Sequence, residues 1–218
     1  MNIQSPKTLP LSSPFHCGTE RSCTDCGVKL CRDTLVVQAA VKLIEAGARA
    51  TLVRQVTQLP TKMVKRLFLM LTGHASPRGQ MPFTDTWYRE NERRMLHATI
   101  VWQLYRHMNA RENMHFSKLL LDVYHAYLCL VSTPLLDITR TFFVLRLVSM
   151  KLFAERVCPE CKKPFLAPAD EQEGKHCSGC RLYFRFRCPQ CKAPFNAKTV
   201  GRPRTVCDQC RQLSLPQK

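Results

Sequence analysis

Eight cysteines near the C-terminus repeat one pattern twice with identical spacing. In each copy, two C-x-x-C pairs are separated by fifteen residues. Two residues between cysteines let one tight turn aim both sulfurs at one metal ion, and the intervening hairpin returns the second pair to close a tetrahedron. The spacing therefore predicts two structural zinc sites, each with four thiolates and no open position for catalysis. The ligands are Cys158, Cys161, Cys177 and Cys180 in the first copy and Cys188, Cys191, Cys207 and Cys210 in the second.

The cysteines also indicate the compartment. The chain has 13 cysteines in 218 residues, but residues 1–16 contain no apolar core typical of a signal peptide. The best candidate for a membrane span, residues 138–153, carries Arg140, Arg146 and Lys151, so we interpret it as a buried helix. We therefore expect a cytoplasmic protein without a membrane partner, because clustered thiolates bind metal in a reducing compartment. A disulfide framework is the alternative.

The charge of the chain favours a polyanionic partner. Lys and Arg number 33 against 16 Asp and Glu, which gives a formal net charge of +17. Each zinc ion with four thiolates adds about −2, so two sites lower the net charge of +17 to about +13. A basic excess of this size indicates nucleic acid as the partner. A soluble surface with surplus lysine is the alternative.

Four further cysteines lie in a polar leader, residues 1–33, which contains Pro and Ser. Their spacing lacks the fifteen-residue return of the other two groups, so we do not expect a third zinc site, and a disordered extension is the preferred interpretation. The domains we expect are this leader, a helical domain at 34–155, a first zinc module at 156–182 and a second zinc module with a tail at 183–218. The leader cysteines are Cys17, Cys23, Cys26 and Cys31.

The fold predicted is mainly α: a helical bundle with a helix-turn-helix-like pair, followed by two tandem zinc-ribbon-like modules. Apolar residues recur at helical spacing, Gly47 and Gly73 end helices, and Thr61 is a plausible N-cap. No alternating strand pattern precedes residue 155. Trp87, Tyr88, Trp102, Tyr105, Phe142 and Phe143 fall at helical spacing and are assigned to the core, as is Cys129. The helices predicted cover residues 35–46, 48–56, 61–71, 86–108, 115–131 and 133–154.

The helix at 61–71 is a candidate recognition helix. Met63, Val64, Leu67, Phe68 and Leu71 form its apolar face, and basic side chains project from the other faces. A recognition helix presents such side chains to phosphates and base edges in the major groove. Any helical hairpin with a basic outer face has the same pattern, so this alternative stays open. The basic residues are Lys62, Lys65 and Arg66.

The two zinc modules differ in charge. The loop ADEQEGK (169–175) of the first is acidic, whereas AKTVGRPRT (197–205) of the second carries Lys198, Arg202 and Arg204. The basic loop is suited to lie against phosphates, and its Gly-Arg-Pro is similar to arms that enter the minor groove. Between the modules, RLYFRFR (181–187), with Arg185 and Arg187, is predicted to be a strand with one packed and one basic face; a base-stacking platform is the alternative.

Several segments resemble one known family. GARATLVRQVTQLPTKMVKRLFLMLTG (47–73), PRGQMPFTDTWY (77–88), HATIVWQLYR (97–106) and TPLLDITRTFFVLRLV (133–148) precede a four-cysteine site, in the order found in FlhC, the C subunit of the bacterial flagellar master activator. The resemblance covers roughly residues 35–180. It carries the zinc ligands of the family over to Cys158, Cys161, Cys177 and Cys180. The leader and the second zinc module depart from the family pattern.

The resemblance implies a transcriptional activator subunit. Such a subunit binds promoter DNA together with a small helical FlhD-like partner and recruits RNA polymerase, and relatives on conjugative elements activate transfer genes instead of flagellar ones. Because the chain shows no Ser/His/Asp set, paired carboxylates or phosphate-binding glycine loop, we do not expect an enzyme. The alternative function is a zinc-stabilised adaptor that binds protein or RNA without sequence-specific DNA binding.

Overall fold

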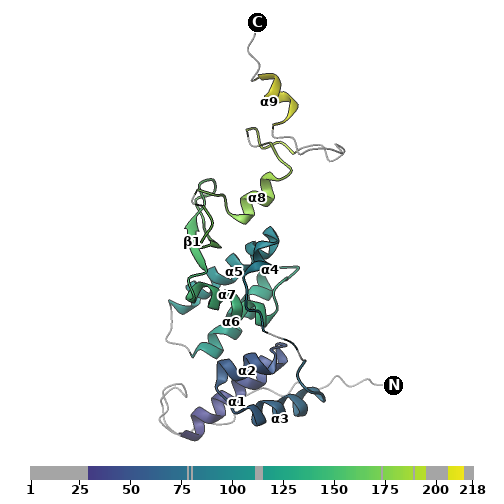
Figure 1. Cartoon of the computed structure of the whole chain (residues 1–218), viewed down its shortest axis with the longest axis vertical. Helices are drawn as coiled ribbons and strands as arrows, with labels where there is room; N and C mark the ends of the chain where they lie inside the picture. Colours follow the sequence, from purple (N-terminus) through teal and green to yellow (C-terminus); the bar gives the residue numbers. More distant parts are fainter. Residues whose placement is uncertain are drawn as a thin grey trace, which may run out of the picture.

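The computed structural model describes residues 29–77, 79, 81–110, 115–172, 174–188, 190–194 and 206–213, and the side chains from Asp33 onward within them. These residues form helices and one two-stranded antiparallel sheet, which confirms the mainly α fold. Figure 1 shows the helical body below the sheet, with the last two helices leading away from it toward the C-terminus. The elements are α1 Lys29–Glu45, α2 Ala50–Thr57, α3 Thr61–Thr72, α4 Thr86–Arg89, α5 Glu92–Asn109, α6 Phe116–Leu130, α7 Ile138–Ser149, β1 Phe153–Val157, β2 Pro164–Pro168, α8 Ser178–Phe184 and α9 Asp208–Leu213.

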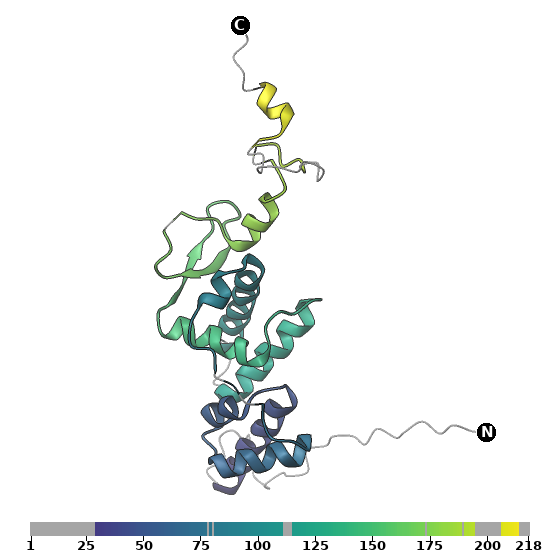
Figure 2. The same cartoon turned by 45° about the vertical axis from the view of Figure 1, so that its right-hand side comes forward.

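The first three helices pack against one another at one end of the body (Figure 2). The chain turns between α1 and α2 at Gly47, whose φ of 84° favours glycine, and α3 ends at Gly73 with a φ of 73°. Buried residues of the helices, such as Leu43, Leu52 and Phe68, join the main core. Thr61 is not the N-cap of α3 as predicted: Pro60 occupies that position, without a side-chain cap, and Thr61 is the first helical residue.

The helix predicted over 86–108 is two helices. α4 ends at Arg89, and α5 starts after Asn91, whose extended backbone (φ −146°, ψ 121°) breaks the helical path. The side-chain oxygen of Asn91 accepts a hydrogen bond from the Arg93 amide at 2.8 Å. This N-cap satisfies an amide that would otherwise lack a partner at the start of α5.

The last helix of the body is also shorter than the predicted 133–154. It starts at Ile138, because Asp137 caps it by accepting the Arg140 amide at 2.7 Å. The segment before it is not helical, and the Tyr127 hydroxyl accepts the amide of Leu135 at 2.9 Å. Beyond the helix, the chain enters β1 at Phe153, so a strand does begin before residue 155. The domain boundary expected at 155/156 falls inside this strand.

Aromatic residues join the parts of the core. Tyr88 is fully buried, stacks on Phe143 of α7 and meets Phe153 of β1 edge to face, and its hydroxyl donates to the Arg140 carbonyl at 2.7 Å. The ring of Trp87 contacts the guanidinium groups of Arg94 and Arg140, each 4.3 Å from its centroid. The aromatic residues predicted for the core are buried or packed against it, but Cys129 is exposed, contrary to prediction.

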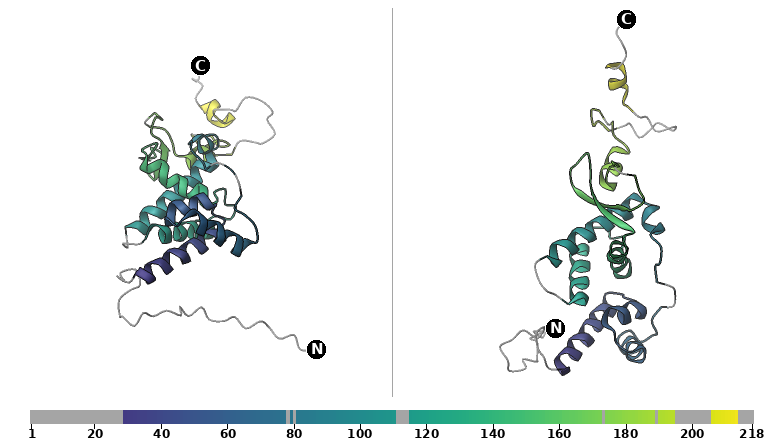
Figure 3. Two further views of the ribbon diagram at one scale, coloured as in Figure 1. Left: turned by 60° about the horizontal axis from the view of Figure 1, so that its bottom comes forward. Right: turned by 60° about the vertical axis from the view of Figure 1, so that its left-hand side comes forward.

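The sheet lies at the far end of the body from α1, beside α5 and α8 (Figure 3). β1 pairs with β2 in antiparallel register, from Phe153 opposite Pro168 to Val157 opposite Pro164. Both faces of β2 are buried: Leu166 joins the main core, whereas Phe165 and Ala167 pack with Cys158 and Cys180 of the first group of cysteines. Within the described residues, no helix combines the length and apolar character needed to cross a membrane.

Candidate zinc modules and nucleic-acid interface

The structure gathers the first four cysteines around one point. Cys158 and Cys161 lie on the turn between β1 and β2, and Cys177 and Cys180 lie at the start of α8. Their four Sγ atoms all lie within 4.8 Å of one another, with Cys158 to Cys180 at 3.8 Å and Cys161 to Cys177 at 3.7 Å. Four sulfurs at Zn–S distances of about 2.3 Å in a tetrahedron are about 3.8 Å apart. The donor set therefore fits a zinc ion.

The second four cysteines repeat this arrangement. The Sγ atoms of Cys188, Cys191, Cys207 and Cys210 also lie within 4.8 Å of one another, and those of Cys191 and Cys207 are 3.5 Å apart. The structure thus brings together both predicted groups, which are compatible with two zinc sites. Of the leader cysteines, Cys17, Cys23 and Cys26 lie outside the described residues, and Cys31 is described only by its backbone in α1.

The backbone explains why the two groups have one geometry. After each first C-x-x-C pair the chain adopts a left-handed conformation, at Lys162 (φ 57°) and at Lys192 (φ 62°). In each group, the second pair also supplies an amide donor to a sulfur of the first pair. The amide of Cys177 donates to Cys158 Sγ at 3.3 Å, and the amide of Cys207 donates to Cys188 Sγ at 3.4 Å. Such donors favour thiolates over thiols.

The pKa values within the groups are spread in both directions. Burial raises the pKa of Cys158, but amide donors from Cys177, Cys161 and Glu160 outweigh it and lower the pKa to about 6. The amides of Cys191 and Cys207 lower the pKa of Cys188 to about 6.

The pKa values of two neighbouring cysteines, Cys180 and Cys210, are raised instead. Hydrogen bonding to the sulfur of Cys207, and then to that of Cys191, raises the pKa of Cys210 to about 12, and burial raises the pKa of Cys180. Four thiolates at one point repel one another, and a bound cation removes that repulsion. The arrangement is therefore suited to hold a metal ion.

The first module is fixed to the body through α5. Glu155 of β1 accepts hydrogen bonds from Trp102 Nε1 at 2.8 Å and Gln103 Nε2 at 3.2 Å, and also pairs with Arg106. The amide of Leu166 donates to Thr99 Oγ1 at 3.2 Å. These contacts connect both strands of the sheet to the same helix.

The acidic loop of the first module belongs to this connection. Asp170 pairs with Arg89 at the end of α4, and Glu171 pairs with Arg181 at 3.3 Å. Arg181 also binds Glu92 of α5, with Nε 3.0 Å from Oε2. The acidic loop therefore holds its module against the helical body.

Among the described residues, one lysine joins the second module to the first. Lys192 Nζ lies 2.7 Å from Glu160 Oε1 and 4.2 Å from the ring centroid of Phe184. Arg187 donates to the Lys192 carbonyl at 3.1 Å. The basic-loop residues predicted to contact DNA, Lys198, Arg202 and Arg204, lie outside the described residues.

The segment RLYFRFR is not a strand, contrary to prediction. Residues up to Phe184 belong to α8, which starts because the Cys177 sulfur accepts the Cys180 amide at 3.3 Å as an N-cap. A metal-site residue thus also begins the helix. Phe184 packs toward the first cysteine group, whereas Tyr183 and Phe186 are exposed, as is Arg185.

The predicted recognition helix has a mixed outer surface. Lys62, Lys65 and Arg66 are exposed as expected, and Val64 and Phe68 are buried. Met63 and Leu71 do not belong to the buried face, however, because both are exposed. Leu69 and Met70 increase the apolar part of this surface, and Met70 is 71% exposed.

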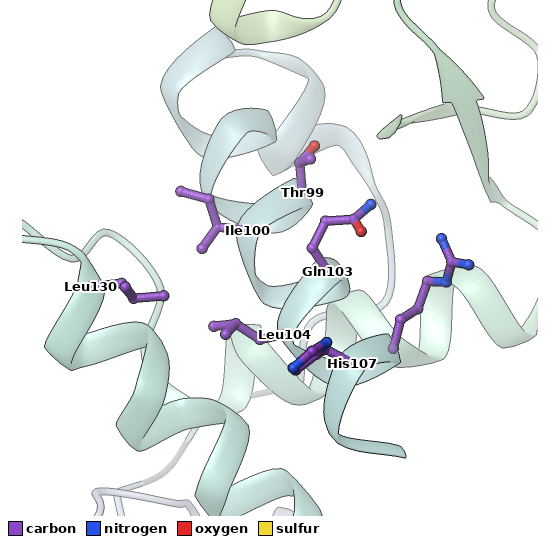
Figure 4. Close-up of a pocket in the computed structure, with 7 residues that line it drawn as sticks. Thr99, Ile100, Gln103, Leu104, His107 and Leu130 are labelled. Atoms are coloured by element: carbon purple, nitrogen blue, oxygen red, sulfur yellow. The ribbon is translucent and has the colours of Figure 1, made fainter. Parts of the chain in front are cut away.

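A groove of about 610 Å³ runs between α5 and the end of α6. Figure 4 shows Thr99, Ile100, Gln103, Leu104 and His107 on one side and Leu130 on the other. Ile100, Leu104 and Leu130 form its apolar part, and its polar lining includes Arg106 and His107. The groove has no chemistry that identifies a ligand.

Comparison with known proteins gives consistent matches. The family described as "Flagellar transcriptional activator (FlhC)" matches residues 28–199. The chain is 26% identical over 151 residues to the flagellar transcriptional regulator FlhC of Enterobacter cloacae, a match that covers 66% of this chain and 78% of that protein. It is 28% identical over 150 residues to the FlhC of Variovorax paradoxus, covering 66% and 74% respectively. The family match includes the first cysteine group but ends before Cys207 and Cys210.

Proposed function

Because the chain belongs to the flagellar transcriptional activator (FlhC) family, we propose that it is the DNA-binding subunit of a cytoplasmic transcriptional activator. It acts with a small helical FlhD-like subunit, binds double-stranded promoter DNA and recruits RNA polymerase. The regulated genes are flagellar genes or the transfer genes of a mobile element. The observation that carries this proposal is the family match over residues 28–199, which spans the helical body and the first cysteine group.

Both cysteine groups hold structural Zn²⁺ in this proposal. When bound, the ion supplies charge neutralisation and a rigid tetrahedral centre, without an open position for a substrate. The amide donors to Cys158 and Cys188 hold negative charge on the sulfurs that the ion requires. Both modules contain few apolar residues, so metal binding supplies much of their folding free energy.

Two basic surfaces are proposed to contact DNA. One is the exposed face of α3, and the other combines the end of α8 with the basic loop of the second module. The net charge of +17 supports binding to a polyanion. The residues proposed for DNA contact are Lys62, Lys65 and Arg66 on α3, and Arg185, Arg187, Lys198, Arg202 and Arg204 beyond the first module.

Exposed apolar residues on α3 support the presence of a protein partner. Leu69 and Met70 are 59% and 71% exposed, next to Leu71 at 43%. Large apolar side chains clustered on a surface are typical of an interface with another protein. An FlhD-like subunit is the partner that family membership suggests for this surface.

The test is an electrophoretic mobility shift of promoter duplexes with the purified chain, alone and with its FlhD-like partner. We expect a sequence-specific shift that requires both subunits and weakens steeply with salt, because phosphate contacts release counterions. Arg202→Ala with Arg204→Ala should weaken binding and leave two zinc ions bound. Loss of zinc from this double variant would contradict the assignment of these arginines to DNA contact.

The second candidate function is an adaptor that binds protein or RNA. The exposed apolar face of α3 favours it, because a recognition helix for DNA is usually polar where it is exposed. The same mobility shift separates the two functions. An absence of any shift on duplex DNA at low salt, with the partner present, would support the adaptor.

A further inference from the structure

Two aromatic rings between the zinc modules are exposed in the described structure, although Tyr183 also meets the ring of Phe184 edge to face. Tyr183 is 50% exposed and Phe186 is 67% exposed. Phe184, which lies between them in sequence, packs toward the first cysteine group and under Lys192. The segment therefore separates one ring that stabilises the fold from two that face solvent.

Each exposed ring is paired with an arginine. The Arg187 guanidinium lies 4.6 Å from the Tyr183 ring centroid, and that of Arg185 lies 5.6 Å from the Phe186 centroid. Tyr183 lies in the last turn of α8, whereas Arg185, Phe186 and Arg187 follow the end of the helix at Phe184, and Arg187 reaches back over the Tyr183 ring. A guanidinium that stacks on a ring keeps in-plane N–H donors available for phosphate.

The surface around these rings is positively charged. Residues 181–187 contain three arginines and no acidic residue. Two neighbouring acidic groups have basic partners, because Glu160 pairs with Lys192 and Glu171 pairs with Arg181. Flat rings beside guanidinium groups match the two parts of a nucleotide, the base and the phosphate.

The segment that carries Tyr183 and Phe186 is held in place at both ends. The Cys177 sulfur caps α8 at its start, and Arg181 ties the helix to Glu92 of α5. Beyond the helix, Arg187 and Lys192 connect it to the second cysteine group. A surface ordered before binding loses less entropy when it meets its ligand.

We propose that Tyr183 and Phe186 stack on bases at a partly unstacked step of promoter DNA, while Arg185 and Arg187 contact the flanking phosphates. Apolar side chains that enter a base step from the minor groove unstack and bend the duplex. This inference rests on the proposed function, because it assigns a contact within the same protein–DNA complex. It makes the end of α8 a site of base contact in addition to α3 and the basic loop.

The affinity test uses the full chain with its FlhD-like partner and a fluorescently labelled promoter duplex. Tyr183→Leu and Phe186→Leu keep apolar bulk but remove the flat ring, and each should weaken binding by roughly five- to hundredfold. Phe186→Trp should retain wild-type affinity. The matched control is Phe83→Leu, because Phe83 is 69% exposed elsewhere on the chain. Wild-type affinity in both leucine variants would overturn the proposal.

Salt dependence separates the roles of ring and guanidinium. Arg185→Ala should lower the slope of log affinity against log salt by about 1, because one phosphate contact is lost. Phe186→Leu should weaken binding with the slope unchanged. Zinc content and circular dichroism confirm that each variant is folded. A reduced slope in the phenylalanine variant would show a general loss of docking and contradict base stacking.

The unstacked step is located with 2-aminopurine placed at successive positions of the duplex. Wild-type protein should raise the fluorescence of 2-aminopurine at one base step. The Tyr183→Leu, Phe186→Leu double variant should not raise it at any position. If wild-type protein binds but no position responds, this inference fails and the proposed function stands. If wild-type protein does not bind duplex DNA at all, the proposed function fails. Variants that bind normally but no longer activate transcription would assign the rings to a protein contact instead.

Discussion

Arg181 of α8 binds Glu92 at the start of α5, with Nε 3.0 Å from Oε2, across 89 positions of sequence. The same guanidinium pairs with Glu171 of the acidic loop. One arginine therefore joins the helical body, the acidic loop and the helix that carries Cys177 and Cys180. The first zinc module is in this way held against the helical body by side-chain contacts.

Arg181→Met should destabilise the protein by about 1–2 kcal/mol, because two partly exposed carboxylates lose a charged hydrogen-bond partner. The free energy of unfolding by urea measures the change. The control is Lys118→Met, because Lys118 and Asp122 form an exposed pair at 3.7 Å along one helix. That control should change stability by less than about 0.5 kcal/mol. Equal effects in the two variants would contradict the special role of Arg181.

Asn91→Ala should destabilise the protein by about 1 kcal/mol, because the Arg93 amide at the start of α5 loses its cap. Asn91→Asp should retain most of the stability, since aspartate caps equally well. Thermal unfolding followed by circular dichroism at 222 nm provides the comparison. An aspartate variant as unstable as the alanine variant would show that capping is not the reason.

The two cysteine groups could be predicted because the spacing of cysteines along the chain determines their local geometry. A C-x-x-C turn returns both sulfurs to one point whatever surrounds it, so all eight cysteines lie in the predicted groups. The helical periodicity also located the body. The apolar periodicity of residues 86–108 predicted one continuous helix and gave no sign of the break at Asn91. An asparagine followed by Glu92 is nevertheless a recognisable cap signal.

Other features depend on contacts that no local pattern contains. α7 starts at Ile138, and the Tyr127 hydroxyl from α6 binds the Leu135 amide in the non-helical segment before it. The segment RLYFRFR alternates as a strand does, but its first four residues belong to α8, which the Cys177 sulfur caps. The partners of the acidic loop, Arg89 and Arg181, were likewise not recognisable from composition.

Removing the metal should affect the two modules differently. Cys188→Ser should lower the zinc content from two ions to one and leave the unfolding of the helical body nearly unchanged, because the described part of the second module contacts the first through Lys192 and not through α5. Cys158→Ser should also lower the zinc content by one ion. In addition, it should lower the melting temperature of the helical body, because the first module packs on α5. Metal analysis and calorimetry of the two variants test this. Equal melting temperatures would contradict the docking described here.

Stability should also depend on pH through His97. Its Nδ1 lies 2.6 Å from the Tyr127 hydroxyl, which accepts the Leu135 and Leu136 amides and therefore donates its proton to a neutral ring. Burial, and then the charge of Arg93, lower the pKa of His97 below its usual value near 6.5. Above about pH 6.5 the ring is neutral in both states, and its contribution to stability is complete.

As the pH falls below that value, the unfolded chain binds a proton that the folded chain does not, so the contribution is lost by at most about 1.4 kcal/mol per pH unit until the lower folded pKa is reached. Glutamine does not titrate, so His97→Gln removes this pH-dependent contribution to stability. The difference in unfolding free energy between wild type and variant should therefore shrink from pH 7.5 to pH 5.5. Protonation of the zinc ligands affects both proteins alike and cancels in the difference. His107→Gln, at an exposed position on the same helix, is the matched control. A constant difference for His97→Gln would mean that the folded state accepts the proton and that the bond to Tyr127 does not require a neutral ring.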